Sequence, residues 1–310
     1  TPWTDQCKTI KEVIIEPGLT SVGNYAFASF FDVEHIDLPD TVTKIGDYAF
    51  RGCFHLPYLA LGDQINDIGK SACRCCYALV DITVPNGVTE IKDSVFSSCQ
   101  GLKHITIPDH LTSIGDYAFS LCKCLTLITL PDSLTSIGRG AFRECQSLAA
   151  VKVPRGMTKI EDYTFCQCES LVSIQLPESL KSIGHRAFWW CKKLNNICFP
   201  EGMTYIGDGA FNGCESLISL KLPDGIKYIE NHSFRGCKGL LSVTLPKSLL
   251  MIGDCAFQDC QQLPSIHIPK GTISIGLYAF KNCYELQGVT IPRSIVSIGL
   301  GAFWWLTEER

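Results

Sequence analysis

Cysteine is the residue type whose number and spacing first suggest chemistry in this sequence. The chain has 18 cysteines, and two short segments, Cys73-Arg-Cys75-Cys76 and Cys122-Lys-Cys124, place five thiols close together in sequence. Clustered thiolates can bind zinc, but zinc sites more often use a C-x₂₋₄-C spacing. Twelve of the cysteines, Cys76 and Cys122 among them, recur at one position of a repeat. A structural role therefore explains them better, and we predict no metal site and no cofactor.

Carboxylates and histidines do not form a recognisable catalytic group either. Six aspartates share one repeat position: Asp47, Asp93, Asp116, Asp162, Asp208 and Asp254. Calcium needs several oxygens converging on one point, and each repeat offers a single carboxylate, so we expect these residues to cap short helices instead. The seven histidines are scattered, and common motifs of hydrolases, nucleotide-binding proteins and zinc proteases are absent from the sequence. The sequence therefore predicts a protein that is not an enzyme.

One repeated unit organises the whole chain. Thirteen isoleucine or valine positions run from Val22 to Ile298 in equal steps of 23, without an insertion or deletion. A phenylalanine stands five residues later in twelve repeats, and a proline stands six residues earlier in eleven. The unit reads L-x-x-I-x-[ILV]-P-x-x-[LVI]-x-x-I-G-x-x-A-F-x-x-C-x-x. Such regularity predicts a solenoid in which each repeat forms one coil.

Each part of the repeat has a predicted structural role. In Leu102-Lys-His-Ile105-Thr-Ile107, the isoleucines are two residues apart and share one face of a short strand. Stacking on the next coil at about 4.8 Å buries this face and forms a parallel sheet. Pro108 ends the strand, because proline cannot donate to the ladder. A second extended stretch precedes Ile114, and residues 116–122 are expected to form short helices or turns on the convex side.

The repeat resembles the BspA-like leucine-rich repeats of surface and adhesion-type proteins. The resemblance covers about residues 7–306, with departures at Cys73 and at Lys92, Glu161 and Glu230 in the glycine position. It implies a leucine-rich-repeat superhelix with a concave parallel sheet, formed by a single domain over residues 1–310 with a short polar tail at 307–310. It also implies that partners bind to the concave face.

The resemblance directs attention to the outward side chains of the first strand in each coil. Acidic and aromatic residues gather there in the first third of the chain, whereas serine and threonine dominate later. The alternative is an ordinary solvated sheet, because small hydroxyl residues also favour strands. We predict a partner-binding face at Tyr58, Asp81, His104, Thr106, Leu127 and Thr129.

Two adjacent tryptophans suggest a second interface. Trp189 and Trp190 occupy positions that hold arginine, asparagine or glycine in other repeats, so we expect them at the surface. Exposed tryptophan is enriched where proteins bind one another. The alternatives are contact between coils and packing under a neighbouring long side chain.

Charge and hydropathy limit the classes of partner. The net charge is −4 without a block of like charges, which argues against nucleic acid or an anionic membrane. No apolar run approaches 18 residues, so membrane insertion is not expected. The remaining hypotheses are a cell-surface or secreted adhesion protein that binds host or microbial surface proteins, an intracellular interaction scaffold, and a structural protein that associates end to end. Twelve cysteines share one repeat position that is apolar in the remaining coils, which predicts a buried ladder of reduced thiols. Reduced thiols favour the hypothesis of an intracellular, cytoplasmic protein.

Overall fold

The computed structural model describes residues 7–304, which form two compact units that meet in the chain at Gly156 and Met157. Unit 1 comprises residues 7–156 and unit 2 residues 157–304. The predicted polar tail at 307–310 lies outside the described residues. Within residues 7–304 the regular secondary structure consists of 23 short strands.

Each coil of unit 1 contributes a first strand or isolated bridge and a two-residue second strand. The first strands are β1 (Glu12–Ile14), β3 (His35–Asp37), β6 (Asp81–Thr83), β8 (His104–Thr106) and β11 (Ala150–Lys152). The second strands are β2 (Ser21–Val22), β4 (Lys44–Ile45), β5 (Asp67–Ile68), β7 (Glu90–Ile91), β9 (Ser113–Ile114) and β10 (Ser136–Ile137). Both extended stretches that the sequence predicts are therefore present.

Unit 2 repeats the same plan. Its first strands are β13 (Ser173–Gln175), β16 (Ser219–Lys221), β18 (Ser242–Thr244), β20 (Ser265–His267) and β22 (Gly288–Thr290). Its second strands are β12 (Lys159–Ile160), β14 (Ser182–Ile183), β15 (Tyr205–Ile206), β17 (Tyr228–Ile229), β19 (Met251–Ile252), β21 (Ser274–Ile275) and β23 (Ser297–Ile298).

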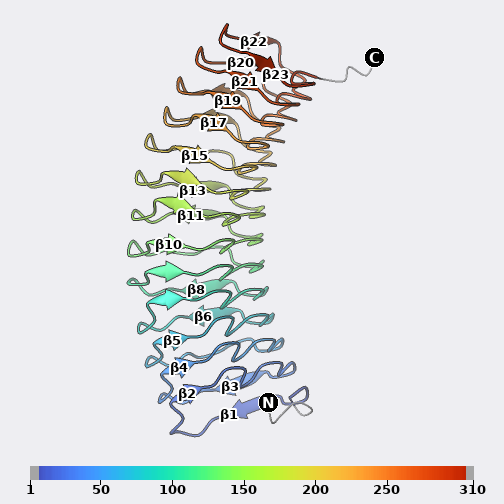
Figure 1. The fold of residues 1–310 in the computed structure, drawn as a ribbon. Helices are drawn as coiled ribbons and strands as arrows, with labels where there is room; N and C mark the ends of the chain where they lie inside the picture. Colours follow the sequence, from blue (N-terminus) through green and yellow to red (C-terminus); the bar gives the residue numbers. More distant parts are fainter. Residues whose placement is uncertain (1–6, 305–310) are drawn as a thin grey trace. The chain divides into compact units, whose positions relative to one another are not determined.

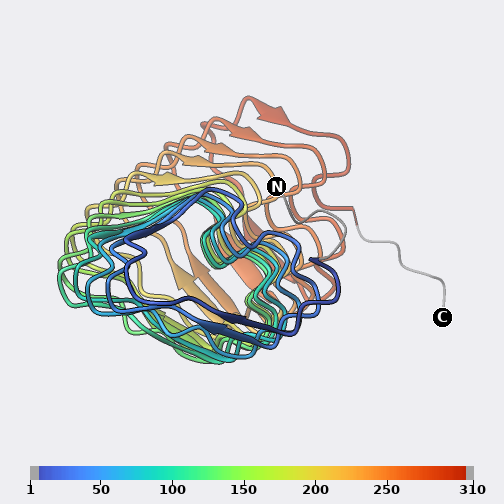
Figure 2. The same cartoon turned by 90° about the horizontal axis from the view of Figure 1, so that it is seen from below.

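Strands of successive coils pair in parallel, and each residue pairs with its counterpart one repeat later. In unit 1, Asp81 pairs with His104 between β6 and β8, and Ile45 pairs with Ile68 between β4 and β5. Within each unit the strands stack one on another along the chain, and the blue and green coils overlie each other when viewed from the end (Figure 1, Figure 2). Within each unit the architecture is a parallel β-solenoid with turns of about 23 residues, as the repeat predicts.

Phenylalanine fills the centre of every coil but one, where Cys73 takes its place. The side chains of Phe96, Phe119 and Phe142 are fully buried. Phe119 stacks on Phe96 and Phe142 with ring centroids 5.6 and 5.4 Å apart. Unit 2 continues the pattern, with Phe211 stacked 5.5 Å from Phe234. Because rings of neighbouring coils stack on one another, the repeat length sets the spacing of the core as well as that of the sheets.

The prediction of short helices is wrong for the described residues. In the stretch after Gly115, Tyr117 has a φ of 55° and Leu121 a φ of 64°, which interrupts the right-handed conformation that a helix requires. The N–H groups of Tyr117, Phe119 and Leu121 donate to carbonyls of the next coil, at Arg139, Ala141 and Arg143. The intervening amides bond locally, as from Ser120 to Tyr117. The stretch is a series of turns that forms a third ladder between coils.

The aspartates after Ile-Gly do not cap helices, and that prediction is also wrong. Asp116 Oδ1 accepts a hydrogen bond of 2.7 Å from the N–H of Arg139, which is the same position in the next coil. Asp93 accepts in the same way from Asp116. The glycine before Asp116 allows this close approach, since a Cβ on Gly115 would lie 2.6 Å from the backbone nitrogen of Asp93. The column is therefore a side-chain ladder between coils.

The cysteine column lies in the core, beside the phenylalanines. All 18 cysteines lie within residues 7–304, and the structure places none of them in a disulfide. The thiol of Cys122 donates to the carbonyl of Phe96 at 3.2 Å, and Cys145 donates to Phe119 at 3.2 Å. Burial raises the pKa of Cys99 to about 11 and that of Cys283 to about 12. These thiols are therefore protonated at neutral pH and poor nucleophiles.

Native thiol titration tests this ladder. Cys198 is exposed, three cysteines are partly buried (Cys75, Cys124 and Cys255), and the other 14 are buried. With a thiol reagent at about pH 8, we expect one fast thiol, up to three slower ones, and all 18 only after unfolding without reductant. Cys198→Ser should remove the fast phase alone. A total well below 18 in denaturant would show that the column is oxidised.

Candidate binding surfaces

The outward face of unit 1 brings the predicted partner-binding residues onto neighbouring coils. Tyr58 forms a parallel bridge with Asp81, and Asp81 pairs with His104 between β6 and β8. Leu127 holds the same position in the following coil. Neighbouring strands are about 4.8 Å apart, so these four side chains form one row about 14 Å long.

Two large apolar side chains stand at the ends of this row. Tyr58 and Leu127 are each 62% exposed. Between them, Nδ1 of His104 lies 2.7 Å from Oδ1 of Asp81, and both side chains are open to solvent. The predicted Thr106 and Thr129 are exposed two residues after His104 and Leu127, in the second outward row. The strand alternation thus presents aromatic, acidic, basic and aliphatic groups side by side, a mixture suited to recognition.

A hollow at the ends of β6 and β8 adds residues that the sequence analysis missed. It encloses about 340 Å³ and is lined by Asp63, Thr83, Val84, Pro85, Asn86, Thr106, Ile107, Pro108 and Asp109. The signal was present, because Asp63, Asn86 and Asp109 follow the proline position in successive repeats. Thr106 belongs to both features, so the hollow continues the predicted face.

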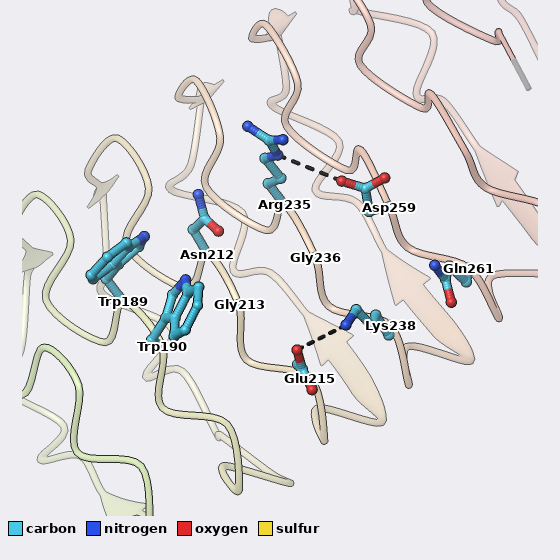
Figure 3. A pocket seen from close by; sticks show the side chains of 10 residues that line it. All are labelled: Trp189, Trp190, Asn212, Gly213, Glu215, Arg235, Gly236, Lys238, Asp259 and Gln261. Atoms are coloured by element: carbon cyan, nitrogen blue, oxygen red, sulfur yellow. Dashed lines mark hydrogen bonds and ion pairs between the residues drawn. The ribbon is translucent and has the colours of Figure 1, made fainter. Parts of the chain in front are cut away.

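The paired tryptophans lie at one end of a groove in unit 2 (Figure 3). The rings of Trp189 and Trp190 are 5.4 Å apart and tilted by 35°. Trp190 is 40% exposed, and Nζ of Lys192 lies 4.9 Å from the centroid of its ring. The side chain is therefore partly covered by a neighbouring lysine, one of the alternatives considered, but it remains at the surface as expected.

Three rows of residues, each advancing by one repeat from coil to coil, build this groove. The middle row begins at Trp190, continues through Gly213 and Gly236, and ends at Asp259 (Figure 3). One side carries Trp189, Asn212 and Arg235, and the other carries Glu215, Lys238 and Gln261. The space between them is about 500 Å³. The tryptophans were predicted from the sequence, whereas the two successive glycines along the middle of the groove were not.

Ion pairs hold the charged side chains of the groove. Nε of Arg235 lies 3.6 Å from Oδ2 of Asp259, and Nζ of Lys238 lies 2.9 Å from Oε1 of Glu215. Such exposed pairs add little stability, but they fix the positions of hydrogen-bonding groups. Within residues 7–304, no group of three or more His, Cys, Asp or Glu side chains is arranged to hold a metal ion.

Comparison with known proteins identifies the fold family. The model of the BspA type leucine rich repeat region matches residues 5–126, 112–240 and 235–308. The chain belongs to this family. The match indicates no enzyme family, and members of such solenoid families generally serve as scaffolds. A search of curated proteins found no match.

Solved structures of bacterial leucine-rich-repeat proteins are similar to this BspA-type chain. A protein from Bacteroides ovatus is 29% identical, with a TM-score of 0.74, over 96% of this chain and 76% of that one. A leucine rich cell surface protein from Faecalibacterium prausnitzii is also 29% identical, with a TM-score of 0.56, over 92% and 80%. One from Eubacterium ventriosum shares the fold at 24% identity and a TM-score of 0.61, over 97% and 84%. The described residues include no helix that could cross a membrane.

A pair of glycine substitutions tests the geometry of the groove. A Cβ on Gly213 would lie 2.7 Å from Cδ1 of Trp190, whereas the nearest atom to a Cβ on Gly236 is 3.6 Å away. Both glycines have positive φ, 77° and 70°, so both substitutions carry a similar backbone cost. Gly213→Ala should therefore destabilise the protein by about 1–3 kcal/mol more than Gly236→Ala, because of overpacking. Denaturant unfolding measures this difference, and equal losses would contradict the placement of Trp190.

Proposed function

We propose that this protein is a non-enzymatic binding scaffold that recognises protein ligands through the outward face of unit 1. The observation that carries the proposal is the row of Tyr58, Asp81, His104 and Leu127 on successive coils. Its two end residues, Tyr58 and Leu127, are large, apolar and mostly exposed. Exposed apolar side chains do not add to the stability of the fold, so a binding role accounts for them better. Aromatic and basic side chains in such a position are common anchors of protein interfaces.

The charge around this row indicates the chemistry of the partner. Asp81 lies within it, and Asp63 and Asp109 line the hollow at the strand ends. We infer that the bound segment carries basic side chains opposite these carboxylates and an apolar group opposite Tyr58 or Leu127. Complementary charge would speed association and make it sensitive to salt.

We further propose a cell-surface or secreted location and a role in adhesion to host or microbial surface proteins. The support is membership of the BspA-type family and the similarity to a structure described as a cell surface protein. A second candidate, an intracellular interaction scaffold, is favoured by a different observation. The 18 cysteines include no disulfide in the described chain, and thiols persist more readily in a reducing compartment.

Capture experiments with a matched pair of variants test the binding face. The Tyr58→Ala, His104→Ala, Leu127→Ala variant should lose partners that the wild type captures from extracellular-matrix and bacterial-surface extracts. Its control is Ser219→Ala, Ser242→Ala, Ser265→Ala, which alters three exposed residues at the same strand position in unit 2. The control should retain those partners.

Binding that is unchanged in the first variant, with its fold confirmed by circular dichroism, would contradict the proposed face. The loss of partners in both variants would mean that no particular face of the sheet is responsible. An extract of cytosol, tested in parallel, separates the two candidate locations by showing where the face-dependent partner is found.

A further inference from the structure

The groove of unit 2 is a second site, at different coil positions from the face proposed above. Its middle is open because two successive coils have glycine where most other coils carry side chains. The same position holds Ser98, Leu121, Glu144 and Gln167 in earlier coils. At Gly236 the backbone lies open between two rows of side chains (Figure 3), so a ligand can approach it closely. At Gly213 the missing side chain leaves room for the edge of the Trp190 ring.

The tryptophan at the end of the groove offers an apolar surface and one hydrogen-bond donor. A Cβ built on Gly213 would lie 2.7 Å from Cδ1 of Trp190 and 3.0 Å from its Nε1. The pyrrole edge of the indole therefore projects over the glycine floor. Within the described residues the indole N–H of Trp190 has no hydrogen-bond acceptor, which leaves it available to a ligand.

The side walls provide polar groups of both kinds. The side-chain amides of Asn212 and Gln261 make no hydrogen bond within residues 7–304. Each amide can donate through its nitrogen and accept through its oxygen. The planar ends of Arg235 and Asp259, held 3.6 Å apart, add a donor and an acceptor at the far end.

The charges that line the groove balance. Arg235 and Lys238 contribute two positive charges, and Glu215 and Asp259 contribute two negative charges. A strongly anionic ligand would meet the two carboxylates, and a strongly cationic one would meet the lysine and the arginine. The groove is thus suited to a neutral ligand that combines apolar patches with many hydroxyl groups.

We propose that this groove binds a neutral saccharide. Sugar rings have C–H faces that pack against an indole, and their hydroxyls donate to and accept from amide, carboxylate and guanidinium groups. The volume of about 500 Å³ lies within the range, roughly 300–1,000 Å³, that is common for small-ligand sites. The groove follows the coil axis from Trp190 to Asp259 across three steps of about 4.8 Å. An oligosaccharide therefore fits it better than a single sugar.

Titration of the full chain with maltotriose, cellotriose, mannotriose and triacetylchitotriose tests the proposal, with a sulfated heparin tetrasaccharide as the charged comparison. The readout is the NMR signal of the tryptophan indole N–H groups, assigned with single-tryptophan variants. We expect at least one neutral trisaccharide to shift the Trp190 signal at millimolar or lower concentration. Trp190→Ala, read through the indole signal of the neighbouring Trp189, should weaken that binding about tenfold or more. Trp304→Ala, at an exposed tryptophan outside the groove, should leave it unchanged.

Gly236→Gln blocks the floor without removing any lining group. The substitution should fold, because Gln167 occupies the same position with a φ of 59° and a Cβ at Gly236 meets only ordinary contacts. It should abolish saccharide binding while leaving the fold and partner capture by unit 1 intact. Binding that survives Gly236→Gln, shifts caused only by the sulfated sugar, or no shift with any neutral trisaccharide would overturn the proposal.

Discussion

Hydrogen bonding between successive coils is the constraint on which the rest of this protein depends. A coil cannot satisfy its own backbone, and three successive donors, Tyr117, Phe119 and Leu121, find their acceptors one coil further on. Two of these residues adopt a left-handed conformation, which costs about 1–2 kcal/mol each. The ladder and the buried phenylalanine offset that cost. A residue inserted within any of the three ladders would shift its register against the next coil, which is consistent with the constant repeat length from Val22 to Ile298.

This constraint fixes the residues that face the core or the next coil, whereas residues on the outer surface can vary and can bind ligands. Isoleucine, glycine, phenylalanine and cysteine positions face the core or the next coil. The outward strand positions carry no such demand, so the same place holds Tyr58 in one coil and Ser219 in another. Binding features can therefore differ from coil to coil without loss of stability. The row beginning at Tyr58 is one such local departure, and the groove beginning at Trp190 is another, at surface positions of the turn stretch.

The sequence predicted the strands and the outward rows because both follow directly from spacing. Isoleucines two residues apart define a strand face, and the structure places His104 and Thr106 outside as expected. It could not decide between short helices and turns after Gly115, since Asp116 before an apolar segment looks like a helix cap and nothing marks Tyr117 as left-handed. The groove was missed because its opening depends on two absent side chains. That residues 1–310 form one domain, and that the named residues bind a partner, stay predictions.

Residue-resolved hydrogen exchange tests the central claim most directly. The amides of Tyr117, Phe119 and Leu121 donate to the next coil, as the amide of Gly115 does to the carbonyl of Ile91 in the coil before. The account predicts that all four exchange slowly and with similar protection, because they open only when coils separate. Rapid exchange at Tyr117, Phe119 and Leu121, with Gly115 still protected, would show that the turn stretch is not a ladder and would contradict the account.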